Sequence, residues 1–370
     1  MEIVRKRSRF IDGARSVLGT VVLGLFAVGF AGCSDDDDDG IDPPVGYDAE
    51  PILRQAAHGV IFATYEDLRF AAADLNGAIA VLRVGPSETT LAAARSAWRA
   101  ARVPWEQSEG FLFGPVSDEG LDPAIDSWPV NETDLNAVLA SGEELDQELI
   151  DGLGDELKGF HTLEYLLFGL DSQKPISAFT AREFEYLGAC AADLSNKTER
   201  LAESWDPKGE NFGRFLIAPG DDNPRYASQA SAMQELLEGM VTIADEVANG
   251  KIDGPLSEQD VTLEESRFSR NSIADFQDNI RSIQNLFLGR YDGNDGPGFD
   301  EFVRANDPGL EARVKTEIQA AIDAIGAIPA PFTTAIFEAP QAVAAAQIAV
   351  RTLQDTIDRD VRPVLADLSR

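Results

Sequence analysis

EPILRQAAHGVIFATYEDLRFAAADLNGAIAVLR, residues 50–83, is the stretch that decides the fold class. After Pro51 it contains no proline, and its apolar residues recur at the spacing of one helix face. Residues 87–113 continue the pattern, and Pro104 is expected to kink that helix in its middle. No stretch shows a sustained alternating strand pattern, and runs of β-branched residues are scarce. The sequence therefore predicts an all-α protein, with further helices at about 132–150, 155–170, 178–204, 224–249, 264–289, 309–327 and 340–368.

A faint internal repeat indicates how these helices are grouped. EGFLFGP at residues 109–115 and QNLFLGRY at residues 284–291 each follow a long amphipathic helix, and each precedes a loop rich in proline and glycine. We therefore expect two related helical bundles, at residues 49–205 and 206–370, joined near 205–223.

Composition excludes two classes of protein. The chain has 370 residues, of which 44% are hydrophobic, so it can form a sizeable core and is not a disordered protein. Its formal net charge is -33, which argues against nucleic acid as a partner because phosphate binding needs a basic face. An acidic surface suits a secreted protein or one that meets cations.

The N-terminus resembles a bacterial lipoprotein leader. A basic start precedes the apolar segment at residues 17–32, which ends in FAGC, so residues 1–32 are predicted to be a signal peptide and Cys33 to be lipidated. Phe30 departs from the leucine usual at the first lipobox position, and an ordinary signal peptide or an uncleaved anchor remains the alternative. The aspartate run and the prolines that follow predict a flexible acidic tether at residues 33–48.

GFHTLEYLLFGL, residues 159–170, contains one of only two histidines in the chain. On a helix, His161 and Glu164 lie side by side, opposite a row of leucines, and the segment is apolar almost all round. Such a segment is buried, so neither polar group is expected to lack a partner. Either the pair satisfies itself or a neighbouring helix, or both residues offer lone pairs to a metal ion.

A second acidic pair lies in RVPWEQSEGF, residues 102–111. Glu106 and Glu109 are three residues apart and follow Trp105, whereas Arg102 precedes Glu106 by four residues. A salt-bridged pair on the protein surface is the alternative to a site here. Farther along, Ser269 and Asn271 make the segment polar where a helix is expected to begin, and helix capping explains much of that polarity.

Taken together, these segments resemble the imelysin-like family of bacterial envelope proteins, which includes the iron-regulated protein A group. Four motifs carry the resemblance: WEQSEGFLFGP at 105–115, IDSWPVN at 125–131, Gly-x-His-x-x-Glu at 159–164, and ESRFSRNSIADFQDNIRSIQNLFLG at 265–289. The resemblance implies an all-α fold of two related bundles with a cleft between them. It also implies a role in iron uptake or iron-responsive physiology, with His161 and Glu164 at the candidate site.

Some members of that family are catalogued as metallopeptidases. An inverted zinc-peptidase motif is His-x-x-Glu-His, but position 165 of this chain is Tyr165. A catalytic zinc normally takes three protein ligands, and the other histidine, His58, is expected to make a polar contact within its bundle. A carboxylate-rich site suits iron better than zinc, because hard oxygen ligands favour hard cations.

The resulting hypothesis is a periplasm-facing lipoprotein of the outer membrane that binds iron or an iron-carrying ligand. The expected metal ligands are His161, Glu164 and Glu106, with zinc the less favoured metal. The residues expected to line or support the cleft are Glu109, Trp105, Arg102, Ser269 and Asn271. Its expected partners are the metal, the membrane and an iron-transport protein. The alternatives are a metallopeptidase and a metal-free scaffold that binds a peptide or protein.

Overall fold

Helices make up most of residues 46–369, the part of the chain that the computed structural model describes. Within it, the strands β1 (Arg290–Tyr291) and β2 (Asn294–Asp295) form one small antiparallel pair. The all-α prediction is therefore confirmed. None of the helices in these residues is both long and apolar enough to cross a membrane. The signal peptide predicted at 1–32, Cys33 and nearly all of the predicted tether lie outside the described residues.

Most of the core is formed by seven long helices: α2 (Ala63–Val84), α3 (Glu88–Glu106), α9 (Ala181–Trp205), α11 (Gln229–Asp245), α13 (Ser272–Leu288), α15 (Pro308–Gly326) and α17 (Pro340–Thr356). The shorter α-helices are α1 (Glu50–Arg54), α4 (Pro115–Asp118), α5 (Leu121–Asp126), α6 (Glu132–Ala140), α7 (Gln147–Asp151), α8 (Gly159–Phe168), α10 (Gly213–Ile217), α12 (Asp253–Glu258), α14 (Phe299–Asn306), α16 (Phe332–Glu338) and α18 (Arg362–Val364).

Tighter and wider turns interrupt these helices. The 3-10 segments are η2 (Glu109–Phe111), η3 (Asp155–Leu157), η4 (Ile176–Ala178), η6 (Val261–Leu263) and η8 (Leu365–Ser369). Three π-helical segments, η1 (Gln55–Phe62), η5 (Glu246–Ile252) and η7 (Ile357–Val361), each continue an α-helix without a break.

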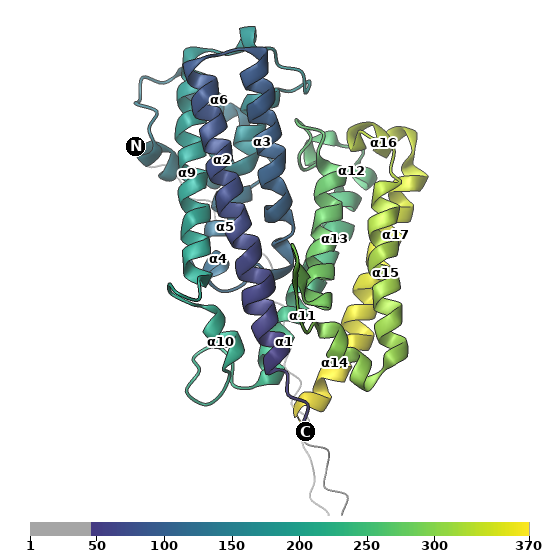
Figure 1. Ribbon diagram of the computed structural model, residues 1–370. Coiled ribbons are helices and arrows are strands. Elements are labelled where there is room, and N and C mark those ends of the chain that lie inside the picture. The colour runs from purple at the N-terminus through teal and green to yellow at the C-terminus, as the bar shows by residue number, and fades with distance from the viewer. Residues whose placement is uncertain (1–45, 370) are drawn as a thin grey trace, which may run out of the picture. The chain divides into compact units, whose positions relative to one another are not determined.

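In the first half of the chain, α2, α3 and α9 lie side by side, and α8 packs against α3 and α9 (Figure 1). Capping boxes at Ser87 and Thr180 start α3 and α9, because each hydroxyl accepts a hydrogen bond from an otherwise unpaired amide. Pro104 lies in the last turn of α3, not in the middle of a helix, because α3 ends at Glu106 and the chain passes into η2. The expected helix through residue 113 was therefore wrong.

In the second half, α15 packs against α13 and α17, and α11 against the same two helices (Figure 1). The short η2 connects the two halves, since it contacts both α11 and α13. A Cβ atom on Gly239 would lie 2.1 Å from the carbonyl oxygen of Gly110, so only glycine permits this approach. The contact fixes the start of η2, and with it Glu106 and Glu109, at the junction. The boundary at residues 205 and 206 remains a prediction.

The segment before α13 differs most from expectation. The predicted helix at 264–289 begins only at Ser272, and Ser266 and Arg270 have positive φ angles of 54° and 60°. Asn271 occupies the position before the helix, but its amide donates to Asp275 Oδ1 at 2.6 Å and does not cap the helix. The capping interpretation was therefore wrong for Asn271. The helix predicted at 132–150 also divides, into α6 and α7.

Candidate metal centre

Gly159 explains why His161 faces the end of α5. Its φ angle is +72°, and a Cβ atom there would lie 2.2 Å from the carbonyl oxygen of Ile125. Only glycine allows α8 to begin so close to this backbone. The next residue, Asp126, consequently places its Oδ1 atom 3.2 Å from His161 Nε2. The glycine of the Gly-x-His-x-x-Glu motif thus positions a carboxylate that is distant in sequence.

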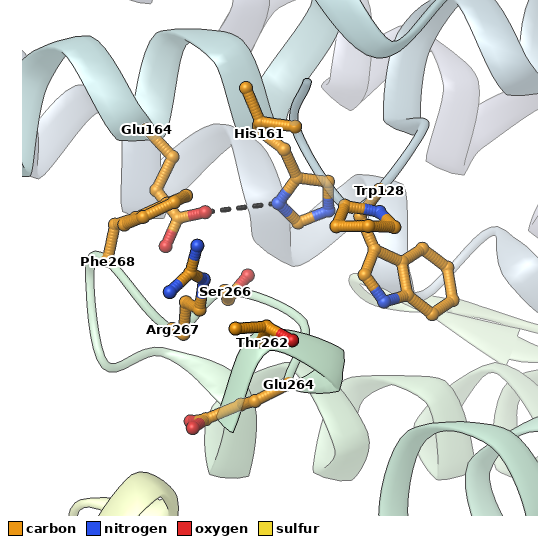
Figure 2. A pocket seen from close by; sticks show the side chains of 10 residues that line it. Trp128, His161, Glu164, Thr262, Glu264, Ser266, Arg267 and Phe268 are labelled. Carbon is orange, nitrogen blue, oxygen red and sulfur yellow. Dashed lines mark hydrogen bonds and ion pairs between the residues drawn. The ribbon is translucent and has the colours of Figure 1, made fainter. Parts of the chain in front are cut away.

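The two ring nitrogens of His161 have different surroundings. Nδ1 lies 3.0 Å from Glu164 Oε2, an interaction drawn in Figure 2. Nε2 lies 3.2 Å from Asp126 Oδ1 and 3.6 Å from Glu265 Oε1, but neither contact has hydrogen-bond geometry. The side chain is only 2% exposed, so water does not supply the missing partner freely. Nε2 is therefore a buried nitrogen that faces two carboxylates without a hydrogen bond.

Asp126, His161 and Glu265 have the spacing of ligands around one cation. One donor atom from each of these three buried residues lies within 4.8 Å of the other two. Metal–ligand distances of about 2.1 Å put neighbouring ligands about 3.0 Å apart at a right angle and about 3.4 Å apart in a tetrahedron. The separations of 3.2 and 3.6 Å from Nε2 are close to these values. The donor set of one imidazole and two carboxylates thus fits a metal ion.

Glu164 lies on the other side of the imidazole from this set. Its Oε1 accepts a hydrogen bond from the backbone amide of Ser269 at 2.6 Å, and its Oε2 faces His161 Nδ1. Such a carboxylate fixes the orientation and tautomer of a histidine and raises its basicity. In this structure Glu164 therefore orients His161, and Ser269 supports Glu164 through its backbone.

Glu106 and Glu109 belong to a neighbouring group. Ligand atoms of these two residues, Asp126 and Glu265 all lie within 4.8 Å of one another, whereas His161 is not part of this group. The Nζ atom of Lys251 lies 2.7 Å from Glu109 Oε2 and 2.9 Å from Glu265 Oε2. The second group therefore already contains a cation of the protein. The structure does not bring Glu106 to His161 Nε2.

Arg102 joins the two groups. Its guanidinium donates to the carboxylates of Asp126, Glu106 and Glu265, and its side chain is fully buried. The alternative of an exposed salt bridge between Arg102 and Glu106 was wrong, because both side chains are fully buried and α13 packs against α3. Trp105 also supports the set, since its Nε1 donates to Asp126 Oδ2 at 2.6 Å.

The buried groups carry more negative than positive charge. Six carboxylates that are at most 7% exposed surround this region, namely those of Glu106, Glu109, Asp126, Glu164, Glu265 and Asp275. Two permanent cations, Arg102 and Lys251, are buried with them. With all six ionised, four negative charges lack a buried counter-ion, or three if His161 is protonated. Uncompensated buried charge is strongly unfavourable, so protons or a bound cation must neutralise part of it.

The pKa values of these groups reflect that imbalance. Burial opposes the charged form of His161, but Asp126, Glu164 and Glu265 outweigh it and raise the pKa of His161 well above its usual value. Burial raises the pKa of Asp275 to about 6 and that of Glu109 well above the ordinary value. His161 is therefore protonated near neutral pH when no metal is bound, and a metal ion must displace that proton.

The remaining predicted residues lie elsewhere or act differently. His58, in η1, has a buried Nε2 atom without a hydrogen-bond partner and belongs to neither group. Asn271 reaches the site only through Asp275, which lies 3.5 Å from Arg102. Sequence reasoning missed Asp126, Glu265 and Lys251. Asp126 and Glu265 lie in the quoted motifs at 125–131 and 265–289, so a search of those motifs for acidic residues could have found them.

Little space adjoins the imidazole. Figure 2 shows His161 and Glu164 on one side of a cavity, with Thr262, Ser266 and Arg267 on the other side. The cavity volume is about 10 Å³, close to the smallest that holds one ordered water molecule. An ion or a water molecule fits this space, whereas a larger organic ligand does not.

Comparison with known proteins agrees with this architecture. Residues 61–359 match the family model described as imelysin, or peptidase M75. The chain belongs to the imelysin family. It is 31% identical over 312 residues to iron-regulated protein A of Synechococcus elongatus, an alignment that covers 83% of this chain and 84% of the relative.

Two crystal structures share the imelysin fold. One, assigned as an iron-regulated protein A precursor from Parabacteroides distasonis, superposes with a TM-score of 0.79 at 27% identity and covers 89% of this chain and 97% of the other. The second, an imelysin-like protein from Psychrobacter arcticum, has a TM-score of 0.71 at 14% identity and covers 87% of this chain and 98% of the other. At that identity the second structure bears on the fold alone.

Proposed function

We propose that this imelysin-family protein binds a single iron ion between Asp126, His161 and Glu265, and that it serves iron uptake at the bacterial envelope, anchored through Cys33. The observation that carries the proposal is the surplus of buried negative charge around His161 Nε2, a nitrogen without a hydrogen bond. A cation bound at this point neutralises charge that Arg102 and Lys251 leave uncompensated.

The identity of the cargo follows from space and ligand chemistry. The cavity that His161 lines holds only about 10 Å³, so an iron-carrying organic ligand does not fit against the imidazole, whereas a bare or partly hydrated ion does. One imidazole and two carboxylates suit iron better than a soft, thiol-preferring metal. The name of the relative from Synechococcus elongatus, iron-regulated protein A, supports iron as the biologically relevant ion.

A metal-free structural cluster is the main alternative. It is favoured by Arg102, whose guanidinium already contacts Asp126, Glu106 and Glu265, and by the two protein partners of Glu164. In that case the charges hold the helices in register without any cargo. A protonated His161 is then held by ion pairs to Asp126 and Glu164, although its Nε2 atom makes no hydrogen bond of normal geometry.

Metal titration separates the two functions. Chelator-treated protein is titrated with Fe²⁺ without oxygen, and the Asp126→Asn and Glu265→Gln variants are compared with wild type. Each variant keeps the side-chain shape, and loss of one ligand is expected to weaken binding by at least about tenfold. Asp193→Asn is the matched control, because Asp193 is an equally buried carboxylate paired with Lys197 outside both groups.

The outcome is decided by the pattern across the variants. Loss of affinity in Asp126→Asn and Glu265→Gln, with wild-type affinity in Asp193→Asn, supports the iron site. The structural cluster is supported if wild-type protein takes up no iron. It is also supported if all three variants bind iron with the affinity of wild type. A chelator-sensitive protease assay on the same samples tests the peptidase alternative, for which Glu164 is already committed to His161 and Ser269.

A further inference from the structure

Two hollows adjoin the proposed ion site, and Trp128 belongs to the lining of both. The inner cavity is the 10 Å³ space beside His161, Glu164, Ser266 and Arg267. The second hollow, called the acidic pocket below, has a volume of about 200 Å³, and its charged lining residues are Glu109, Asp122, Asp126 and Glu246. Trp128 lines both spaces.

Charge distinguishes the two spaces as routes for a cation. The inner cavity has Arg267 as well as Glu164 and Glu264 in its wall, so it attracts a cation less than a wall of carboxylates alone, and it is too small to admit a hydrated ion. None of the described residues that line the acidic pocket is basic. Lys251 Nζ, behind the lining, lies 2.7 Å from Glu109 and 3.8 Å from Glu246 and offsets part of their charge, which leaves the four lining carboxylates in excess. Clefts lined by one sign of charge concentrate ions of the opposite sign and accelerate their binding. The acidic pocket is therefore the better route on both size and charge.

Asp126 connects the acidic pocket to the buried imidazole. It forms part of the pocket wall, and its Oδ1 atom lies 3.2 Å from His161 Nε2. This nitrogen is buried and makes no hydrogen bond, and Asp126 is its nearest charged neighbour, so a cation that reaches Asp126 from the pocket also approaches Nε2. The carboxylates of Asp122 and Glu246 are farther out and are not members of the three-residue set around Nε2.

Trp128 is placed to restrict passage between pocket and site. Its ring centroid lies 6.3 Å from that of His161, and Lys251 Nζ lies 5.6 Å from the ring. The other three tryptophans of the chain, Trp98, Trp105 and Trp205, are fully buried, whereas Trp128 is partly exposed. Its indole therefore covers the buried charges from the solvent side.

We propose that the cation reaches His161 through the acidic pocket, that Asp122 and Glu246 attract it there, and that Trp128 limits its rate of passage in both directions. This proposal rests on the proposed function, because it concerns access to the same ion site. Asp122, Glu246 and Trp128, which are not ligands, would thus affect the rates of association and dissociation, whereas the ligands determine affinity.

Stopped-flow kinetics with Co²⁺ as the probe test the attraction. The visible absorption of bound Co²⁺ reports binding and dissociation in all variants of the full chain. Asp122→Asn and Glu246→Gln are each expected to slow association roughly two- to fivefold and to weaken its dependence on ionic strength, with little change in dissociation. Asp155→Asn is the control, since it removes an equal charge from a pocket that also contains Lys158, Lys197 and Arg200.

Substitution of Trp128 tests the restriction separately. In Trp128→Ala, association and dissociation should both accelerate by the same factor, so that the dissociation constant is unchanged. The two rates of Trp128→Phe, which retains an aromatic ring, should lie between those of Trp128→Ala and those of wild type. A residue with a merely structural role would change affinity or stability, not both rates equally.

The outcomes separate this proposal from the proposed function. If wild-type protein binds no Co²⁺, or if Asp126→Asn does not abolish the binding, the ion site is refuted and the route is refuted with it. If uptake is normal but Asp122→Asn, Glu246→Gln and Trp128→Ala all keep wild-type rates, the ion site stands and the route is overturned. Slower association in the two acidic variants, together with matched acceleration in Trp128→Ala, supports the route.

Discussion

Glu164→Gln should disable the ion site without altering any of its ligands. In wild type, Glu164 Oε1 accepts from the amide of Ser269 at 2.6 Å, and Oε2 accepts from His161 Nδ1 at 3.0 Å. A glutamine has the same shape, but one of its two terminal atoms is an NH₂ donor. Because the amide of Ser269 requires an acceptor, the NH₂ group must face Nδ1. The imidazole then has to leave Nδ1 unprotonated and carry its proton on Nε2.

The expected loss of affinity follows from that change of tautomer. A proton on Nε2 blocks the lone pair that faces Asp126 and Glu265. Removing a carboxylate that orients a metal-binding histidine typically lowers affinity by about 10- to 100-fold, which corresponds to about 1.4 to 2.8 kcal/mol. Glu164→Gln should lie at the upper end of this range, because the variant favours the wrong tautomer as well as losing charge. The pKa of His161 should also fall, since Glu164 is one of the carboxylates that raise it.

Nitrogen NMR and titration together test this reasoning. The chain contains only two histidines, so the ring resonances of His161 can be assigned by comparison with a His58→Ala variant. Co²⁺ affinity is measured across pH 5 to 8 on the same samples. Glu183→Gln is a matched control, because Glu183 also accepts from a backbone amide, that of Thr180, and contacts Lys174. Unchanged ring shifts and unchanged affinity in Glu164→Gln would refute the orienting role.

Three further predictions concern the charge, the packing and the anchor. Burial raises the pKa of Asp275 to about 6, so wild-type stability is lost as pH rises through that value. Without metal, the Asp275→Asn variant should therefore be more stable than wild type at pH 8, by up to about 3 kcal/mol, and as stable as wild type near pH 4. Urea unfolding at the two pH values measures both differences. Gly159→Ala should destabilise by a few kcal/mol in the same assay, whereas Gly77→Ala, with open space around its Cα, should be neutral or slightly stabilising. Cys33→Ala should release the protein from membranes and abolish labelling by fatty acid; unchanged labelling contradicts the lipoprotein prediction.

Local sequence patterns predicted the helices and the polar pair at 161 and 164, because both depend on spacing along one helix. They failed where long-range burial decides the outcome. Arg102 and Glu106, four residues apart, have the pattern of an exposed ion pair, and only the tertiary structure, in which α13 packs against α3, shows that they are buried. The contact of Asp126 with His161 likewise depends on the close approach of α8 to α5. Gly159 permits this approach, but the position of a glycine in the sequence does not show which segment packs against it.

The surplus of buried carboxylates provides a test of the proposed ion site against a purely structural junction. Side chains such as Arg102 and Lys251 are fixed counter-ions, and a rigid junction would need only as many acids as they can neutralise. The additional acids destabilise the protein unless mobile cations accompany them, and the mobile cation is either a proton or a metal ion. Protons leave as pH rises, so a proton-filled cluster loses stability as pH rises from the ordinary pKa of an aspartate, about 4, to the raised pKa of Asp275, about 6. A metal ion binds more tightly as pH rises further, because the proton on His161, whose pKa is also raised, then leaves and no longer competes with the metal. Stability that falls with pH in chelator and rises with pH in excess Fe²⁺ would therefore identify the metal ion as the cation that this arrangement of charges accommodates.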